Sequence, residues 1–228
     1  MDVVFLIGLA AGLVLISLLV LTRVTRLQVW PCPEKWSAER VTFWTLFRAT
    51  NLAALAVILL GVAPGLTDDP LRVAAAVLGI VCAFVYVAAC LELGRENLYC
   101  GSAGLKVRGM YRWSRNPQYA AAIPGYLSGA VAAGTAEALV LAGVVSVVFF
   151  LMAMLEDRWL HQTYGVHFDA YRARVSRFYN VRRVRSLGRS ARRKVRSVAR
   201  RAAPSLMAQA GRSRTHGGGD AERQRFGR

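Results

Sequence analysis

The chain has 228 residues, 55% of them hydrophobic, and a formal net charge of +17 from 30 Lys and Arg against 13 Asp and Glu. Soluble globular chains are on average less apolar and much closer to charge balance, so this composition excludes an ordinary soluble domain and indicates a membrane protein with a basic appendage. The positive charge is localised, because residues 171–201 hold 13 Arg and Lys and no acidic residue, whereas the first 170 residues are nearly balanced.

Five apolar segments approach or reach the roughly 20 residues that a transmembrane helix needs. In chain order they are residues 3–21, 43–62, 71–93, 117–133 and 137–155. The first segment lacks a basic start and a small-residue cleavage site, so we expect a retained helix and not a signal peptide. The fourth is the shortest and contains Pro124.

The distribution of Lys and Arg between these segments predicts the direction of each crossing. Basic residues follow the first, third and fifth segments, whereas only Arg72 follows the second and none lies in the turn at Gly134. This alternation predicts an all-α, multi-pass membrane protein with about five transmembrane helices, the N-terminus outside and the C-terminus in the cytoplasm. Without the fourth helix, the basic segment before Arg115 and the basic tail would lie on opposite sides of the membrane.

The chain is predicted to have three parts: helices in residues 1–93, a core in residues 94–180 and a tail in residues 181–228. Within residues 184–202, small or apolar side chains recur at helical spacing on an Arg-rich segment, which predicts a basic amphipathic helix on an anionic inner leaflet. Nucleic-acid binding is the rival interpretation, but the aromatic residues of single-strand binders are missing. From Gly211 onward the composition is typical of disorder.

Two polar clusters flank the last pair of apolar segments. Arg115 and Asn116 precede the fourth, and Glu156 and Asp157 follow the fifth. A helical hairpin would return both clusters to one membrane face, which is therefore the best candidate for an active site. Elsewhere at that face, Arg48 and Glu92 are a plausible ion pair, although Arg48 could instead extend to the headgroups.

The clusters match a known pattern. Gly109, Tyr111, Arg115, Pro117 and Tyr119 reproduce the spacing Gly-x-Tyr-x-x-x-Arg-His-Pro-x-Tyr. A second pattern, Glu-Glu-Arg followed by aromatic-Gly, Tyr and Val-x-Arg, is matched by Glu156, Asp157, Arg158, Leu160, Tyr164, Gly165, Tyr171, Val175 and Arg177. Over residues 93–178 the chain thus resembles the isoprenylcysteine carboxyl methyltransferase and phospholipid methyltransferase family of integral membrane enzymes.

The resemblance implies a cytoplasmic pocket for S-adenosylmethionine and a lipophilic substrate that enters from the bilayer. Arg115 suits the carboxylate of this cofactor, and Glu156 suits its ammonium group or ribose hydroxyls, so both are candidate catalytic residues. The candidate cofactor-binding residues are Gly109, Tyr111, Arg115, Asn116, Pro117, Tyr119, Glu156 and Asp157.

Three positions depart from the family pattern. Asn116 replaces His and lacks its acid and base chemistry, Asp157 replaces the second Glu, and Ala121 stands where Gly is frequent. The preferred function is carboxyl O-methylation of an isoprenylated or other lipophilic substrate, and lipid amine N-methylation is a variant. A non-catalytic membrane scaffold and an NADPH-dependent reductase of related architecture are the alternatives.

Simpler explanations compete with these roles. Arg115 would be ordinary at any cytoplasmic helix end, whereas Glu156 and Asp157 beside a helix C-terminus oppose the helix dipole and are harder to explain. His161 and His167 have no nearby Cys, so we expect no metal site. The four Cys lack paired spacing, and we expect no structural disulfide.

Overall fold

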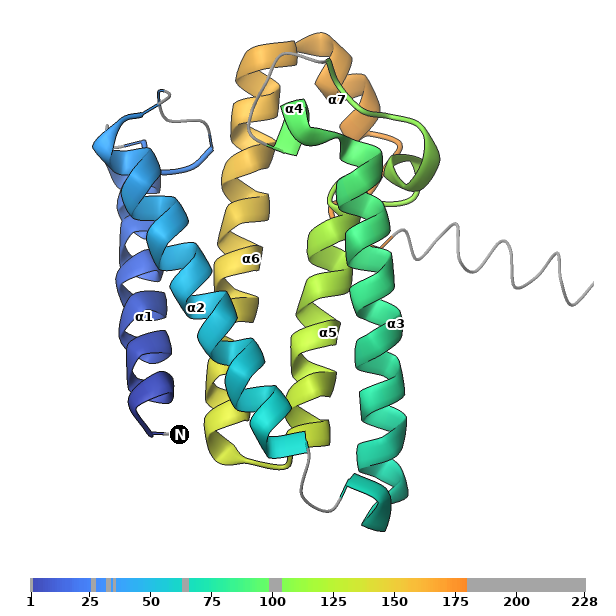
Figure 1. Cartoon of the computed structure of the whole chain (residues 1–228). Coiled ribbons are helices and arrows are strands. Elements are labelled where there is room, and N and C mark those ends of the chain that lie inside the picture. The colour runs from blue at the N-terminus through green and yellow to red at the C-terminus, as the bar shows by residue number, and fades with distance from the viewer. Residues whose placement is uncertain are drawn as a thin grey trace, which may run out of the picture. The chain divides into compact units, whose positions relative to one another are not determined.

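The computed structural model describes residues 2–25, 28–31, 34, 36–62, 66–98 and 104–179. The predicted tail helix, Cys32 and Cys100 lie outside these residues. The described part contains helices and no strand, so the all-α prediction is confirmed there. The elements are α1 (Asp2–Val24), α2 (Ala38–Val62), η1 (Leu66–Asp68), α3 (Pro70–Leu93), α4 (Arg95–Leu98), η2 (Gly109–Arg112), α5 (Pro117–Ala133), α6 (Ala136–Tyr164) and α7 (Val166–Arg172) (Figure 1).

Four helices of the described part are long and apolar enough to cross a membrane, namely α1, α2, α3 and α6. The predicted fourth crossing corresponds to α5, which has 17 residues and does not belong to this set. Many large apolar side chains on the four helices face outward, and α3 buries only Ala75 and Ala89. Such exposed apolar surfaces are typical of helices that contact lipid.

Local sequence signals set the helix ends. The Asp69 carboxylate accepts a hydrogen bond from the Leu71 N–H at 2.8 Å, and Pro70 follows in the first turn of α3. The turn between α5 and α6 combines Gly134, which has a φ of 69°, with Thr135, whose hydroxyl accepts from the Ala138 N–H. This tight turn makes α5 and α6 the hairpin that the sequence predicts.

The helices pack as a bundle in which α5 contacts α2, α3 and α6, and α1 contacts α2 and α6 (Figure 1). Small residues bring α1 close to its neighbours, because a Cβ at Gly8 would lie 2.5 Å from Ala53 and one at Gly12 would lie 2.3 Å from Val144. Close approach through small residues is the usual way for helices to associate in lipid. Aromatic rings fill the core beside them, including Phe43 stacked on Trp30.

Arg72 joins three helices at the end of the bundle where α3 begins. Its guanidinium donates hydrogen bonds to the carbonyls of Gly61, Ala132 and Ala133, at the C-terminal ends of α2 and α5. The last carbonyls of a helix lack partners within the helix, so a cation there satisfies them and complements the helix dipole. Arg72 therefore has a structural role at this end.

The predicted ion pair between Arg48 and Glu92 is wrong. The Arg48 guanidinium lies 5.6 Å from the ring centroid of Trp44, and both Glu92 oxygens accept from the Met110 N–H at 3.1 and 3.0 Å. The reason is helix packing, because α3 packs mainly against α5 while α2 packs against α1, α5 and α6. Glu92 consequently orients the segment before α5.

Candidate active site

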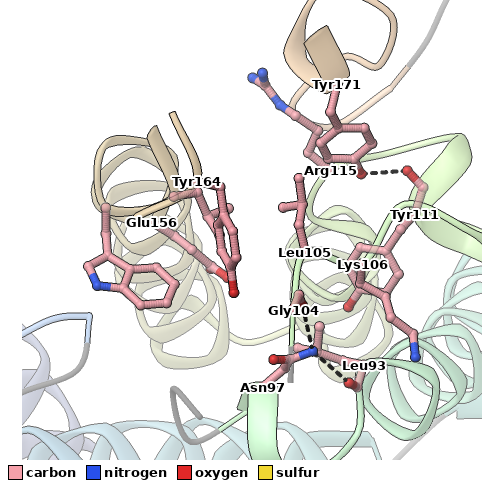
Figure 2. A pocket seen from close by; sticks show the side chains of 12 residues that line it. Leu93, Asn97, Gly104, Leu105, Lys106, Tyr111, Arg115, Glu156, Tyr164 and Tyr171 are labelled. Atoms are coloured by element: carbon pink, nitrogen blue, oxygen red, sulfur yellow. Dashed lines mark hydrogen bonds between the residues drawn. The ribbon is translucent and has the colours of Figure 1, made fainter. Parts of the chain in front are cut away.

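A pocket lies where α3 ends, α5 begins and α6 ends. It contains a cavity of about 40 Å³, which is room for a few water molecules. Figure 2 shows Glu156 and Tyr164 of α6 on one side and Tyr111 and Lys106 on the other. The pocket is lined by Leu93, Asn97, Gly104, Leu105, Lys106, Tyr111, Arg115, Glu156, Trp159, Leu160, Tyr164 and Tyr171.

A buried charge cluster forms part of its wall. Asp157 Oδ2 accepts from Arg115 Nη2 at 2.8 Å and from Arg177 Nε at 2.7 Å. The side chains of Arg115 and Asp157 are only 7% and 8% exposed. One carboxylate thus pairs with two guanidinium groups, and the cluster keeps a net positive charge that suits an anionic ligand.

Arg115 retains unused donors. Its Nε and Nη1 atoms are buried without a hydrogen-bond partner, and its guanidinium lies 5.6 Å from the ring centroid of Phe168. Burial lowers the pKa of Arg115, and the neighbouring Asp157 opposes that effect. Because arginine still remains a cation, the unpaired donors are available to an acceptor that enters the pocket.

Glu156 supplies the pocket with an unpaired acceptor. Its Oε2 atom is buried and has no hydrogen-bond partner. Glu156, Leu160 and Tyr164 are spaced four residues apart on α6 and therefore share one helix face. Asp157, one residue later, is directed instead to Arg115 and Arg177.

The two polar clusters, at the start of α5 and near the end of α6, lie together as expected. Backbone hydrogen bonds also hold the segment after α7 beside the start of α5. The N–H of Arg115 donates to the Ser176 carbonyl at 3.0 Å, and the N–H of Asn116 donates to the Arg177 carbonyl at 3.1 Å. Asn116, which is 1% exposed, also donates from Nδ2 to the Arg177 carbonyl at 3.3 Å. Asn116 therefore holds the segment after α7 beside the start of α5.

Gly109 and Glu92 position Tyr111. Gly109 has a φ of 56°, and a Cβ at this position would lie 1.5 Å from Glu92 Oε1. Only glycine permits both this backbone conformation and this close approach. With Met110 held by Glu92, the Tyr111 hydroxyl donates to Gln118 Oε1 at 3.0 Å.

Tyr171 completes this side of the pocket, where its hydroxyl donates to the Tyr111 carbonyl (Figure 2). Burial raises the pKa of both Tyr111 and Tyr171. Both phenols therefore stay protonated at neutral pH and act as neutral hydrogen-bond donors.

The predicted site residues form three groups: residues that line the pocket, a residue paired with one of these, and residues outside the lining. Tyr111, Arg115 and Glu156 line the pocket, and Asp157 pairs with Arg115. The other four lie outside the lining: Gly109 contacts Glu92, Asn116 binds Arg177, Pro117 is the first residue of α5 and Tyr119 packs on Phe149.

Sequence reasoning assigned no site role to several lining residues. Tyr164 and Tyr171 belong to the downstream pattern, which was a usable signal. Asn97 and Lys106 lie in a polar stretch before the first motif, where nothing in the sequence distinguishes them. Asn97 donates to the Leu93 and Gly104 carbonyls at 3.4 and 3.3 Å and so closes this part of the wall (Figure 2).

A bundle with four helices of membrane-spanning length and a cationic pocket at one end defines an integral membrane protein with a candidate ligand site. Comparison with known families then adds a finding on the pocket region: residues 71–167 match the phospholipid methyltransferase family, in agreement with the resemblance that its motifs carry. The match runs from α3 to the start of α7 and includes Arg115, Glu156 and Asp157. No curated protein and no solved structure matches the chain.

Proposed function

We propose that the chain is a membrane methyltransferase that uses S-adenosylmethionine to methylate the carboxylate of an isoprenylated or other lipophilic molecule. One observation carries the proposal. Within the region that matches the family, Arg115 offers two buried, unpaired donor atoms, and Glu156, which lines the same pocket, offers a buried, unpaired acceptor. Buried polar atoms without partners are rare in folded proteins, and two opposed kinds in one pocket suit a zwitterionic ligand.

The residues of the pocket fit the polar groups of this cofactor. Arg115 would bind its carboxylate through Nε and Nη1, and Glu156 would accept from its ammonium group or ribose hydroxyls. Tyr111 and Tyr164 offer ring faces for its cationic and aromatic parts. Because a cavity of about 40 Å³ is smaller than a nucleoside, we expect the wall formed by residues 104–107 to move outward on binding.

The cofactor supplies an activated methyl group on a sulfonium ion, so the protein mainly contributes alignment and exclusion of water. Holding the reacting groups in line contributes on the order of 7 kcal/mol through proximity. A carboxylate acceptor requires no general base, and the exposed Lys106 at the pocket would attract such an anion. Removing water from the carboxylate strengthens it as a nucleophile.

Methylation of a lipid amine is the second candidate. The Glu156 carboxylate, whose Oε2 atom has no hydrogen-bond partner, could accept the proton that an amine loses, and the matching family is described as phospholipid methyltransferase. Glu156 would therefore act as a general base for an amine acceptor and not for a carboxylate acceptor, and this difference distinguishes the two candidates.

We further propose that five helices cross the membrane, with α5 as the fourth, and that the pocket faces the cytoplasm. A 17-residue helix is about 26 Å long, close to the thickness of the hydrocarbon core. Arg23, Arg40, Lys106 and Arg112 lie near the pocket end, whereas Arg72 lies at the other. This asymmetry supports a cytoplasmic pocket.

A methyl-transfer assay with detergent-purified protein and labelled S-adenosylmethionine tests the proposal. We expect label in an S-prenylated N-acetylcysteine through a base-labile ester. Label in phosphatidylethanolamine through a base-stable bond would instead support the amine candidate. Calorimetric titration with S-adenosylmethionine and with NADPH completes the test: binding of NADPH alone would favour a reductase, and binding of neither would favour a scaffold.

A further inference from the structure

A second polar cavity lies on another face of α6. It has a volume of about 170 Å³ and is formed by the end of α1, residues 28–31 and the last turns of α6. From α6 it takes Leu155, Arg158, Trp159 and Gln162, whose spacing of three and four residues defines one helix face. Trp159 lines both cavities, whereas Glu156 lines only the first.

The wall opposite α6 is held in place by hydrogen bonds. The Val29 N–H donates to the Thr22 hydroxyl at 3.3 Å, and that hydroxyl donates to the Leu18 carbonyl at 3.0 Å. The Gln28 side-chain amide donates to the Pro31 carbonyl at 2.8 Å. The Val29 bond ties the segment to α1 and the Gln28 bond joins the two ends of residues 28–31, so this wall of the cavity is preorganised.

Trp30 contributes a fixed donor that lacks an acceptor. Trp30 is one of the residues that line the cavity, it is 6% exposed, and its buried Nε1 atom has no hydrogen-bond partner. The ring is stacked on Phe43 with a centroid distance of 4.8 Å and meets the edge of Trp44 at 6.3 Å. Because these contacts fix the ring, an acceptor in the cavity would satisfy an N–H that folding alone leaves unpaired.

The charge of the lining favours an anion. Arg158 lines the cavity and forms no ion pair with any described residue, and among the described lining residues there is no Asp or Glu. A guanidinium and an indole N–H from two residues that line one polar cavity are complementary to phosphate oxygens. A cavity of about 170 Å³ has room for a phosphate group with bound water.

The position of the cavity agrees with a membrane source of phosphate. It lies where α1 and α6, both long enough to cross a membrane, come to their C-terminal ends, which is the depth of lipid headgroups. Trp side chains such as Trp30 and Trp159 are enriched at this depth. A phospholipid could therefore place its phosphate in the cavity with its chains along the outer surface of the bundle.

We propose that this second cavity is a phosphate-binding site, distinct from the candidate active site, with Trp30 and Arg158 as its recognition residues. The phosphate belongs either to a phospholipid headgroup or to a soluble phosphate compound. The site stands on its own geometry and does not depend on methyl transfer.

Calorimetric titration of the full-length protein in a nonionic detergent tests the site with three probes: inorganic phosphate, a short-chain phosphatidylglycerol and a diacylglycerol that lacks phosphate. We expect phosphatidylglycerol to bind and diacylglycerol not to bind. Inorganic phosphate that binds as well would identify the phosphate group itself as sufficient. A site that takes inorganic phosphate and not the lipid would be a phosphate site with a soluble source.

Two variants and two matched controls locate the binding. Trp30→Phe keeps the stacking ring and removes the N–H, and Arg158→Gln removes the charge from an exposed side chain; each should weaken binding about tenfold. Trp36→Phe and Arg23→Gln alter exposed residues that do not line the cavity and should leave affinity unchanged. Failure of both phosphate probes to bind, or unchanged affinity in Arg158→Gln with an intact melting temperature, would overturn the proposal.

Discussion

Asp157 is the residue on which the charge balance of the pocket depends. It accepts hydrogen bonds from Arg115 and Arg177 through a single oxygen, in a side chain that is 8% exposed. Removing one partner of a buried ion pair is much more costly than the pair is stabilising, because the remaining charge is left desolvated and unpaired. The three members of the cluster should therefore differ in their effect on stability.

Asp157→Ala leaves both guanidinium groups without a carboxylate and should destabilise the protein by about 3 kcal/mol. Arg177→Ala leaves Asp157 paired with Arg115 and should cost clearly less, since the Arg177 side chain is 35% exposed. Thermal unfolding in detergent measures the order. Equal melting temperatures for the two variants would show that Asp157 does not hold this cluster together.

Glu156→Gln separates binding from folding. Glu156 Oε2 has no hydrogen-bond partner, and the isosteric amide removes the charge while keeping the shape of the side chain, so the melting temperature should change little. Loss of a charge-assisted contact with the cofactor ammonium or ribose should weaken binding of S-adenosylmethionine about tenfold. Unchanged affinity in this variant would remove Glu156 from the cofactor site.

The sequence predicts which main polar residues meet at the candidate site, and their roles there stay predictions. Arg115, Glu156 and Tyr111 reach the pocket because the motifs place them at helix ends that meet. Asn116 and Gly109, which the sequence predicts as cofactor-binding residues, contact Arg177 and Glu92 in the structure, and their part in cofactor binding stays a prediction. A spacing pattern indicates that a residue type is required at a position. Only the structure shows whether a ligand or a neighbouring segment requires it.

At the scale of elements, the segment before α5 is shaped by the contact between Gly109 and Glu92. Gly109→Ala would place a Cβ against the Glu92 carboxylate in a backbone conformation with φ of 56°. We expect a loss of roughly 1–3 kcal/mol together with weaker cofactor binding, because Tyr111 follows in the same turn. Thermal unfolding and titration of S-adenosylmethionine measure the two effects.

A double variant checks the cause of this effect. If the clash with the carboxylate is responsible, adding Glu92→Ala to Gly109→Ala should cost less than the two single variants together. Additive losses would show that Gly109 and Glu92 act independently.

Arg72→Ala provides the contrasting case at the other end of the bundle. The variant removes hydrogen bonds to the carbonyls that end α2 and α5 and should lower stability by about 1–3 kcal/mol. Cofactor affinity should remain that of the parent protein, since Arg72 lies at the end of α3 away from the pocket. A large loss of affinity would mean that the two ends of the bundle are coupled.

The helices themselves follow from hydropathy and local signals such as Asp69, Pro70, Gly134 and Thr135. Which helices pack against each other cannot be predicted in the same way, because apolar side chains that face lipid and those that face another helix look alike in sequence. The mistaken pair of Arg48 and Glu92 arose in this way: both residues were placed at one membrane face, but the contact of α3 with α5 directs Glu92 to Met110.

For the whole molecule, the proposed topology can be tested with single cysteines introduced into a cysteine-free chain. Lys106→Cys is exposed near the pocket, and Ala136→Cys is exposed at the opposite end of the bundle. A membrane-impermeant thiol reagent should label Ala136→Cys in intact cells and Lys106→Cys only after permeabilisation. The reverse pattern would place the pocket outside the cytoplasm.

We propose that the hairpin of α5 and α6 brings Arg115 and Glu156 together to bind one small molecule. Calorimetric titration of S-adenosylmethionine into the purified parent protein, Arg115→Ala and Arg72→Ala tests it most directly. We predict that the parent and Arg72→Ala bind with equal affinity and that Arg115→Ala shows no measurable binding while remaining inserted in the membrane. Binding to Arg115→Ala as tight as to the parent would contradict the claim.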